Sequence, residues 1–277
     1  MDKIKILVAC HKPGPVYHDD VYTPIHVGRA ISKYKEEMSD MIGDDTGDNI
    51  SEKNPYYSEM TAQYWAWKNL HDVEYIGFCH YRRFFNIVIN KCNVESLFKN
   101  KDVILLGYRN IEMVERSLLR SVNLENITIF LKILKRMYPE YEQTVIDYLW
   151  HNKIHGKNML ICRKDLFDQY SEWIFGILSE CEKHIRLSPY TRERRVFAYL
   201  AEYFMPVFFI HNKYIILSIT SSENNNQIKL FIKNVLRSIF FISSKHFSHK
   251  PKSFEDYYSK AVLLGLESDG IIQVIDK

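Results

Sequence analysis

The chain has 277 residues, of which 46% are hydrophobic and 26% charged, and its formal net charge is +3 at pH 7. This composition is typical of a globular protein and excludes extended disorder, while the small net charge excludes the general basic field of nucleic-acid-binding proteins. The five cysteines are scattered without a CxxC pair, which argues against a disulfide framework or a zinc site and fits a reducing cytoplasm.

Strands alternate with helices along most of the chain. The first expected strand, 3–9, starts without the apolar region of a signal peptide, and no run of about 18 uncharged apolar residues marks a membrane span. Asn54 as N-cap and Pro55 at the first helical position predict a helix over 55–71. Further strands are expected at 74–80, 102–106, 158–162, 206–210 and 214–217, and further helices at 123–150 with a break at Pro139, 164–183 and 194–204. This alternation predicts an α/β fold with a mostly parallel sheet covered by helices on both faces.

The run 75–85 begins as an expected buried strand and ends abruptly in cationic residues. His80, Arg82 and Arg83 follow its apolar part and are flanked by aromatic residues. In an open α/β sheet the carboxyl end of a strand opens into the ligand crevice. Two guanidiniums and an imidazole there suit a polyanion such as a diphosphate, and the alternative is a solvated loop after the strand.

The loop 43–51 packs three carboxylates and two glycines into nine residues. Asp44, Asp45 and Asp48 supply oxygen atoms of the kind that bind Mg²⁺ or Ca²⁺, although the spacing is not that of an EF-hand. An ordinary turn rich in Asp, Asn and Gly is the alternative. A loop that contacts the donor sugar or the acceptor is the third interpretation.

Three other segments carry polar residues that suit a ligand. His11 and Lys12 follow the first strand and either touch a nucleotide or form a polar turn. His155 and Asn158 can hydrogen-bond a hydroxylated ligand, or can be structural. Glu202 follows the basic cluster at 192–195, where an acid can serve as a general base. A solvated face of ion pairs is the alternative there.

These segments together resemble a bacterial surface-polysaccharide glycosyltransferase family, long known only as a domain of unknown function, of which one member is assigned as a galactofuranosyltransferase. The resemblance covers roughly residues 1–220. The runs that carry it are Ile6–Lys12, Tyr22–Gly28, Gly43–Ser51, Asn54–Thr61, Tyr64–Asn69 and Gly77–Arg83, and more loosely His155–Met159 and Arg195–Glu202. It implies a GT-A-type fold, a UDP-sugar donor and inverting transfer. We expect a lipid-linked glycan acceptor in capsule, O-antigen or exopolysaccharide synthesis, at the inner face of the cytoplasmic membrane.

The resemblance assigns roles to named residues. The diphosphate of the donor is expected to bind His11, Lys12, His80, Arg82, Arg83 and Arg195. The acceptor is expected to bind His155, Asn158, Tyr57 and Trp67. Inverting transfer needs one base for the proton of the acceptor hydroxyl, and the candidates are Glu202 and, as rivals, Asp45 and Asp48.

One departure from the family pattern concerns the metal. GT-A enzymes usually hold a divalent ion with an Asp-x-Asp at the end of the central strand, where this chain has His80-Tyr81-Arg82. Either Asp44, Asp45 and His80 hold Mg²⁺ or Mn²⁺, or the arginines neutralise the leaving diphosphate without a metal. Each charge-assisted contact contributes about 1.5–3 kcal/mol.

The segment 228–247 has the pattern of a basic amphipathic helix. On a helix, one face would carry the apolar residues Leu230, Phe231, Val235, Leu236, Ile239 and Ile242. Another face would carry the basic residues Lys229, Lys233 and Arg237. Such helices lie on anionic membrane surfaces, and the alternative is a helix packed on the catalytic domain. The predicted domains are therefore a glycosyltransferase domain over 1–222 and a membrane-association segment over 223–277, with a linker at 224–226.

A function of another class stays open, that of a catalytically inert nucleotide- or glycan-binding module in a polysaccharide-assembly complex. The acidic loop, His80, the two arginines and Glu202 occur together in one chain, which favours the transferase. No nucleic-acid partner is expected, and a homo-oligomer is left open.

Overall fold

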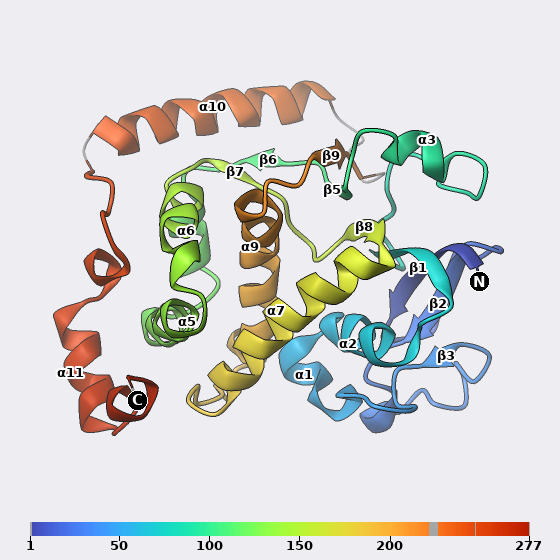
Figure 1. Ribbon diagram of the computed structural model, residues 1–277, viewed down its shortest axis with the longest axis horizontal. Helices are drawn as coiled ribbons and strands as arrows, with labels where there is room; N and C mark the ends of the chain where they lie inside the picture. The colour runs from blue at the N-terminus through green and yellow to red at the C-terminus, as the bar shows by residue number, and fades with distance from the viewer. Residues whose placement is uncertain (1, 222–226, 247, 277) are drawn as a thin grey trace. The chain divides into compact units, whose positions relative to one another are not determined.

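The chain forms two compact units (Figure 1). The structure, a computed structural model, describes residues 2–221, 227–246 and 248–276, without the side chains of 227–233 and 244. Unit 1 comprises Met1–Tyr108, His155–Glu172 and Asn212–Asn225, and unit 2 comprises Arg109–Ile154, Trp173–His211 and Asn226–Lys277. The C-terminal segment therefore clusters with two internal segments. The expected linker and the side chains of Lys229, Leu230, Phe231 and Lys233 lie outside the described residues.

Unit 1 is built on a seven-stranded sheet in the described part of the chain, with the order β3-β2-β1-β4-β8-β5-β9. The strands are β1 (Asp2–Cys10), β2 (Tyr22–His26), β3 (Ile42–Gly43), β4 (Val73–His80), β5 (Val103–Leu106), β8 (Leu160–Arg163) and β9 (Ile216–Ile219). Strand β8 runs antiparallel to both of its neighbours, and every other pair is parallel. The predicted α/β fold with a mostly parallel sheet is confirmed.

The register aligns the carboxyl ends of β1, β2, β3 and β4. Cys10 lies opposite His26, and His26 lies opposite Gly43. On the other side of β1, Ala9 lies opposite His80. Because neighbouring strands lie about 4.8 Å apart, whatever follows these four positions shares one edge of the sheet.

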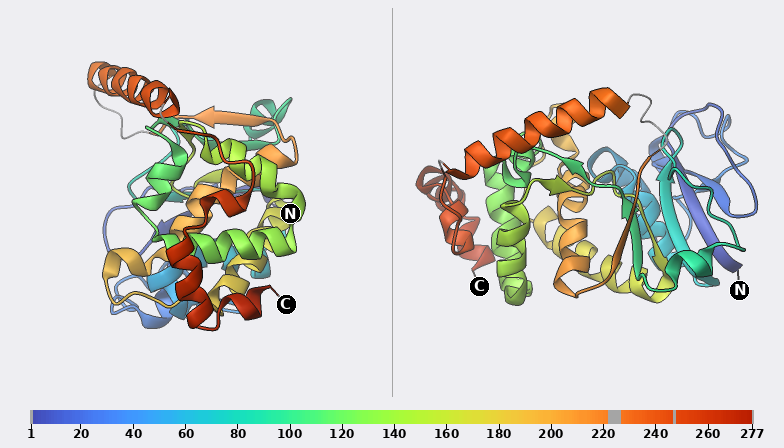
Figure 2. Two further views of the ribbon diagram at one scale, coloured as in Figure 1. Left: turned by 90° about the vertical axis from the view of Figure 1, so that its left-hand side faces the viewer. Right: turned by 90° about the horizontal axis from the view of Figure 1, so that it is seen from above.

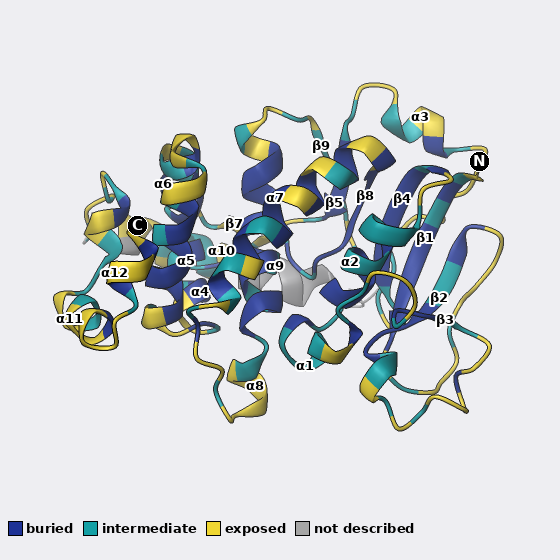
Figure 3. Ribbon diagram, turned by 60° about the horizontal axis from the view of Figure 1, so that its bottom comes forward, coloured by how far each residue is buried: buried dark blue, intermediate teal, exposed yellow. Residues whose placement is uncertain are grey.

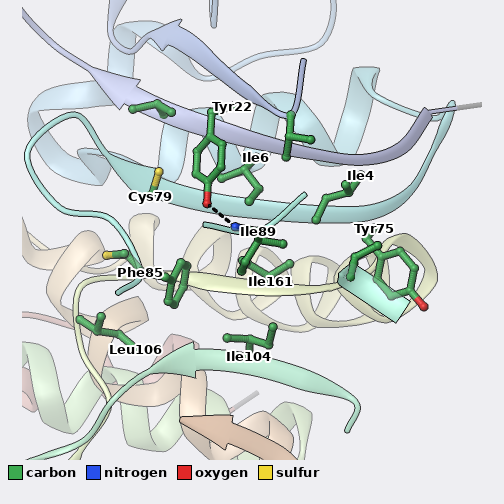
Figure 4. Packing of buried hydrophobic residues seen from close by; sticks show 14 of the residues in the cluster. Ile4, Ile6, Tyr22, Tyr75, Cys79, Phe85, Ile89, Ile104, Leu106 and Ile161 are labelled. Atoms are coloured by element: carbon green, nitrogen blue, oxygen red, sulfur yellow. Dashed lines mark hydrogen bonds between the residues drawn. The ribbon is translucent and has the colours of Figure 1, made fainter. Parts of the chain in front are cut away.

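A cluster of buried hydrophobic side chains in unit 1 lies on one face of this sheet (Figure 4). Ile6, Tyr22 and Ile161 belong to a cluster of buried side chains, and the backbone N–H of Ile89 donates to the Tyr22 hydroxyl at 3.3 Å. Burial raises the pKa of Tyr22 to about 12. An added Cβ at Gly77 would lie 2.7 Å from Ile161 Cγ1, so β4 and β8 approach closely where Gly77 has no side chain.

Helices α1 (Asn54–Tyr57) and α2 (Met60–Asn69) replace the continuous helix expected over 55–71. The break falls at Ser58, whose φ is 48°. Asn54 was expected to cap the helix, but it is the first residue of α1, and its Nδ2 donates to the Ser58 carbonyl oxygen at 2.8 Å. This local bond gives the backbone an alternative to a continuous helix. Unit 1 also contains α3 (Val94–Phe98), the start of α7 (Lys164–Glu182) and the 3₁₀ turns η1 (Arg29–Ile31) and η2 (Ser51–Lys53).

Unit 2 is mostly helical. Its elements are β6 (Arg109–Asn110), α4 (Val114–Leu119), α5 (Leu124–Met137), η3 (Pro139–Tyr141), α6 (Glu142–Leu149), β7 (Lys153–Ile154), the rest of α7, α8 (Thr191–Arg194), α9 (Val196–His211), α10 (Gln227–His246), η4 (Phe254–Tyr257), α11 (Lys260–Ser268) and α12 (Ile272–Ile275). The Asn123 side chain caps α5 by accepting from the Asn126 N–H at 2.9 Å, and the break expected at Pro139 is confirmed. Among the described residues, none of the helices is both long and apolar enough to span a membrane.

The strand expected over 206–210 is wrong, because these residues lie inside α9. Helix α9 is buried along most of its length (Figure 3), and the rings of Phe130 and Phe204 lie 4.3 Å apart between their centroids. A short apolar run does not distinguish a strand from a buried helix. Pro206 is unfavourable in a helix interior, and the tertiary packing outweighs this cost.

Replacing Gly77 with alanine should destabilise the protein by about 1–3 kcal/mol, because the new Cβ overpacks the contact with Ile161. Thermal unfolding followed by circular dichroism measures the effect. Gly265→Ala is the matched control, since an added Cβ on exposed α11 meets nothing within 4 Å. Equal melting temperatures for Gly77→Ala and the native chain would show that β8 has room to move.

Candidate functional site

The functional side chains predicted in unit 1 gather at the carboxyl ends of its parallel strands. His11 follows β1, Asp44 follows β3, and His80 ends β4. His26 ends β2, which lies between β1 and β3 in the sheet. In an open α/β sheet this edge is where ligands bind. The structure therefore brings the unit 1 residues predicted for the donor to the same sheet edge as the acidic loop, although the sequence places them far apart.

The segment after β4 is a tight turn that presents the cationic residues. The Arg83 N–H donates to the His80 carbonyl oxygen at 2.9 Å, and the His80 N–H donates back to Arg83 at 3.2 Å. The tip of the turn holds Tyr81 and an exposed Arg82. The Arg82 guanidinium lies 4.9 Å from the centroid of the Tyr81 ring, and the His11 ring meets the same ring edge-on at 5.4 Å. The Tyr81 ring thus contacts the Arg82 guanidinium and the His11 imidazole, two groups that can donate hydrogen bonds.

His80 itself fixes a second loop. Its Nε2 lies 2.7 Å from the carbonyl oxygen of Lys157. Because a carbonyl oxygen only accepts, Nε2 carries the proton. Lys157 and Asn158 have φ of 73° and 49°, a left-handed conformation that costs free energy in residues other than glycine. His80 therefore helps to hold a strained loop in place.

Glu59, just before α2, and Gln63, within α2, also hold this loop. Asn158 Nδ2 donates to Glu59 Oε1 at 2.8 Å, and Gln63 Nε2 donates to the Asn158 carbonyl oxygen at 2.8 Å. We call His80, Glu59, Gln63, Lys157 and Asn158 the loop clamp. Strained backbone that several partners hold is concentrated at functional sites, so the loop clamp is consistent with the ligand-binding role predicted for this loop.

His155 comes just before Lys157 and Asn158 in the sequence, and it contacts the end of strand β5. Its Nδ1 lies 2.7 Å from the carbonyl oxygen of Leu106, and its ring meets the ring of Tyr108 edge-on at 6.0 Å. Burial lowers the pKa of His155, since it disfavours the charged imidazolium. A neutral ring can both donate and accept a hydrogen bond, as a hydroxylated ligand requires.

The acidic loop is tied down at both of its ends. The buried Asp44 carboxylate accepts from the backbone N–H groups of Gly28 at 2.8 Å and Arg29 at 3.0 Å, and from the Ser51 hydroxyl. Asp48 accepts from the Tyr64 hydroxyl at 3.1 Å. Burial, with this hydrogen bond, raises the pKa of Tyr64 to about 12. Both carboxylates therefore position the loop against neighbouring segments.

A divalent cation held by Asp44, Asp45 and His80 does not fit these contacts. Asp44 already accepts three hydrogen bonds, and His80 Nε2 faces a carbonyl oxygen. Asp45 Oδ1 lies 3.8 Å from the Arg29 guanidinium. Across the described residues, no three His, Cys, Asp or Glu side chains are grouped closely enough to hold a metal ion. We therefore derive no chemical step through a metal at these residues.

The two aromatic residues predicted for the acceptor lie in different environments. Tyr57 is 3% exposed and packs inside the fold, so its ring offers no face to a sugar and the acceptor role does not fit it. Trp67 is half-buried, with its ring in edge contact with Tyr64 and the Lys68 ammonium 3.5 Å from its ring centroid. The buried face of α2 is instead formed by Met60, Thr61, Ala62, Gln63 and Ala66.

Arg195 and Glu202 belong to unit 2, and their predicted roles are not tested by the geometry of unit 1. The Arg195 guanidinium lies 5.3 Å from the ring centroid of Tyr199, one turn away. Glu202 is half-buried on α9. Its charge adds to the effects of burial and of Tyr203 that raise the pKa of Tyr148.

Several residues of the site were missed by the sequence analysis. Tyr81 and Glu59 lie within runs that carry the family resemblance but received no role, and Arg29 was not considered. Gln63 is 1% exposed, and the signal for it was a polar side chain among the apolar residues of α2. His26 is fully buried, and neither of its ring nitrogens has a hydrogen-bond partner among the described residues. Burial lowers its pKa.

Comparison with known proteins agrees with this geometry. A family model described as "Domain of unknown function (DUF4422)" matches residues 5–213. The solved apo structure of WbbM, described as a bifunctional glycosyltransferase, is similar with a TM-score of 0.69 and 25% sequence identity. The similarity covers 81% of this chain and 46% of that chain, so this chain spans about half the length of WbbM. No curated protein matches. The fold expected from the family resemblance is thereby confirmed.

Replacing Lys157 with glycine should raise the free energy of unfolding by about 1 kcal/mol, because glycine adopts a left-handed conformation without the cost that a side chain brings. Denaturant unfolding measures the change. Lys213→Gly is the matched control, since Lys213 has a φ of 60° in an exposed turn outside the loop clamp. A loss of stability in Lys157→Gly alone would mean that the lysine side chain contributes more than the strain costs.

The imidazole of His155 should titrate below the ordinary histidine value of about 6.5, because burial disfavours its charged form. Between the two values the unfolded chain binds more protons, so this ring lowers the free energy of unfolding as the pH falls through that window. Nuclear magnetic resonance of the His155 ring protons, in native buffer and in denaturant, gives both values. A native midpoint at or above the denatured one would contradict the assignment.

Proposed function

Since the chain belongs to the DUF4422 family, we propose that it is an inverting glycosyltransferase that acts in the synthesis of a bacterial surface polysaccharide. The donor is a UDP-sugar, with UDP-galactofuranose as the first candidate, and the acceptor is a lipid-linked glycan. The observation that carries this proposal is the set of cationic and imidazole groups at one sheet edge, in a fold similar to a solved glycosyltransferase.

The donor binds, in this proposal, with its diphosphate against the turn after β4. Arg82 is exposed at the tip of that turn, and the Tyr81 ring contacts both its guanidinium and the His11 ring. Guanidiniums match phosphate oxygens with two donors at once and keep their charge at every working pH. Lys12 follows His11 and adds a further positive charge.

The chemical step breaks the bond between the sugar's anomeric carbon and the diphosphate oxygen. Negative charge then grows on the leaving UDP, and Arg82 and Arg83 stabilise it there. The acceptor hydroxyl attacks from the opposite face and forms the new glycosidic bond, which inverts the configuration. Its proton passes to a carboxylate base, for which Glu202 is the first candidate. Asp48 is engaged with Tyr64, which suits a positioning role better than proton transfer.

The acceptor, in this proposal, contacts the loop that the loop clamp holds. The half-buried His155 supplies the polar group that this loop offers to the acceptor. Asn158 is only 1% exposed, so the acceptor role does not fit it any better than it fits Tyr57, and its side chain instead supports the loop through Glu59. A preorganised loop lowers the entropic cost of binding a flexible glycan. Trp67 is half-buried and keeps part of its surface for such a ligand.

Removing one guanidinium should weaken UDP binding about 10- to 100-fold, since a charge-assisted contact contributes about 1.5–3 kcal/mol. Arg82→Ala and Arg83→Ala test this by isothermal titration calorimetry. Arg163→Ala is the matched control, because Arg163 lies opposite Tyr75, toward the other end of β4. Unchanged UDP affinity in both site variants would refute the assignment of the diphosphate to this turn.

Glu202→Gln should lower transfer by about 10²- to 10⁴-fold, the usual contribution of a general base, and leave UDP affinity unchanged. Asp45→Asn should impair donor binding as well, because Asp45 lies beside Arg29 at the edge where the donor binds. Transfer assays run alongside UDP titration separate the two effects. Near-normal transfer by Glu202→Gln would move the base to another carboxylate.

A further inference from the structure

Helix α10 exposes apolar side chains along one side. Five of them are between 43% and 69% exposed, and they are Val235, Leu236, Ile239, Phe240 and Ile242. At 100° per residue these positions cover an arc of about 160° on the helix surface. A contiguous exposed apolar surface of this kind marks an interaction site.

The opposite side of α10 faces unit 2 and is mostly polar. Asn234, Arg237 and Ser238 are half-buried there, together with Phe241. Arg237 Nη1 donates at 3.0 Å to the carbonyl oxygen of Asn110, on the short strand β6 that α10 contacts. Figure 2 shows α10 from two further sides. A helix that served only as a packing element would turn its apolar side inward. Helix α10 does the reverse, which leaves its apolar side for a partner.

The surroundings of this helix are basic. No Asp or Glu occurs from Gln227 to His246 in the sequence. Burial lowers the pKa of Arg237, and the nearby charges of Arg109 and Arg120 lower it further. At the C-terminal end, Lys245 is exposed and its ammonium lies 5.0 Å from the Phe241 ring centroid.

A second basic group surrounds His151 in the same unit. Burial lowers the pKa of His151, and the charges of Lys245, Lys153 and Lys250 contribute in the same direction. Asp147 opposes them and forms an ion pair with Lys250. Positive charge therefore flanks α10 at its middle and at its end.

We propose that the exposed side of α10 docks on an anionic lipid bilayer. The residues Val235, Leu236, Ile239, Phe240 and Ile242 enter the boundary between headgroups and acyl chains, and the exposed basic side chains near the helix, Lys245 among them, contact the anionic headgroups. A second copy of the chain is a poorer partner, because a two-fold interface would place these positive charges against their own copies. The proposal goes beyond the proposed function and stands without it, since UDP titration in solution does not depend on lipid.

Flotation of the full chain with lipid vesicles tests the proposal. The probes are vesicles of phosphatidylcholine alone and of an equimolar mixture of phosphatidylcholine and phosphatidylserine. The variant Ile239→Asp/Phe240→Asp places two charges on the exposed side. Leu264→Asp/Val274→Asp is the matched control, because these residues are 55% and 54% exposed on α11 and α12 of the same unit.

The native chain and the control should float with the mixed vesicles, and added salt should weaken this binding. The Ile239→Asp/Phe240→Asp variant should lose at least about tenfold in partition, since each buried side chain of this size contributes about that much. A native chain that does not float with mixed vesicles, floats equally with both vesicle types, or floats as well after the α10 substitutions would overturn the proposal. It would also be overturned by a native dimer, seen in analytical ultracentrifugation without lipid, that the α10 substitutions dissociate.

Discussion

The parallel alignment of β1, β2, β3 and β4 is the constraint on which the candidate site depends. Cys10, His26 and Gly43 lie side by side, and His80 is one position away across β1. Both faces of β1 are packed, with Ile6, Val8 and Cys10 in the buried cluster on one face and Leu7 and Ala9 buried on the other. This packing fixes the register, because a slip of one residue would exchange the two sets of side chains between faces that are packed differently. The polar groups that follow the four strands are therefore held close by the core rather than by their own contacts.

The side chains at this edge divide into those that are exposed, and so available to a ligand, and those that hold the neighbouring loops in place. Arg82 is exposed on the Tyr81 ring, whereas Asp44 accepts hydrogen bonds from the turn that follows β2. His80 ends the central strand and supports the strained loop through Lys157. The site thus combines fixed positive charge with a preorganised loop, which is what stabilisation of a leaving diphosphate requires.

The sequence predicts the sheet and most helices because long periodic runs carry strong signals. It fails at 206–210, where a proline and four apolar residues are equally consistent with a strand. The donor-binding role of His80, Arg82 and Arg83 could be predicted because Arg and His after an apolar strand form a local pattern, and that role stays a prediction. The loop clamp could not be predicted, since Glu59 and Gln63 reach Asn158 across 99 and 95 positions of the chain. Tertiary contacts also decide the role of Asp44. The composition of its loop indicates a metal ligand, whereas its hydrogen bonds to Gly28 and Arg29 show that it holds the loop in place.

The most direct test of the account is the release of UDP from a panel of UDP-sugars, UDP-galactofuranose included, by the purified full chain without acceptor. Many transferases slowly hydrolyse their donor, whereas a binding module does not. With the native chain, at least one UDP-sugar of the panel should release UDP faster than the same UDP-sugar does in buffer without protein. The Arg82→Ala variant should abolish this acceleration. A chain that binds a UDP-sugar but releases UDP from none of them, with or without a glycan acceptor, would be a binding module and would contradict the account.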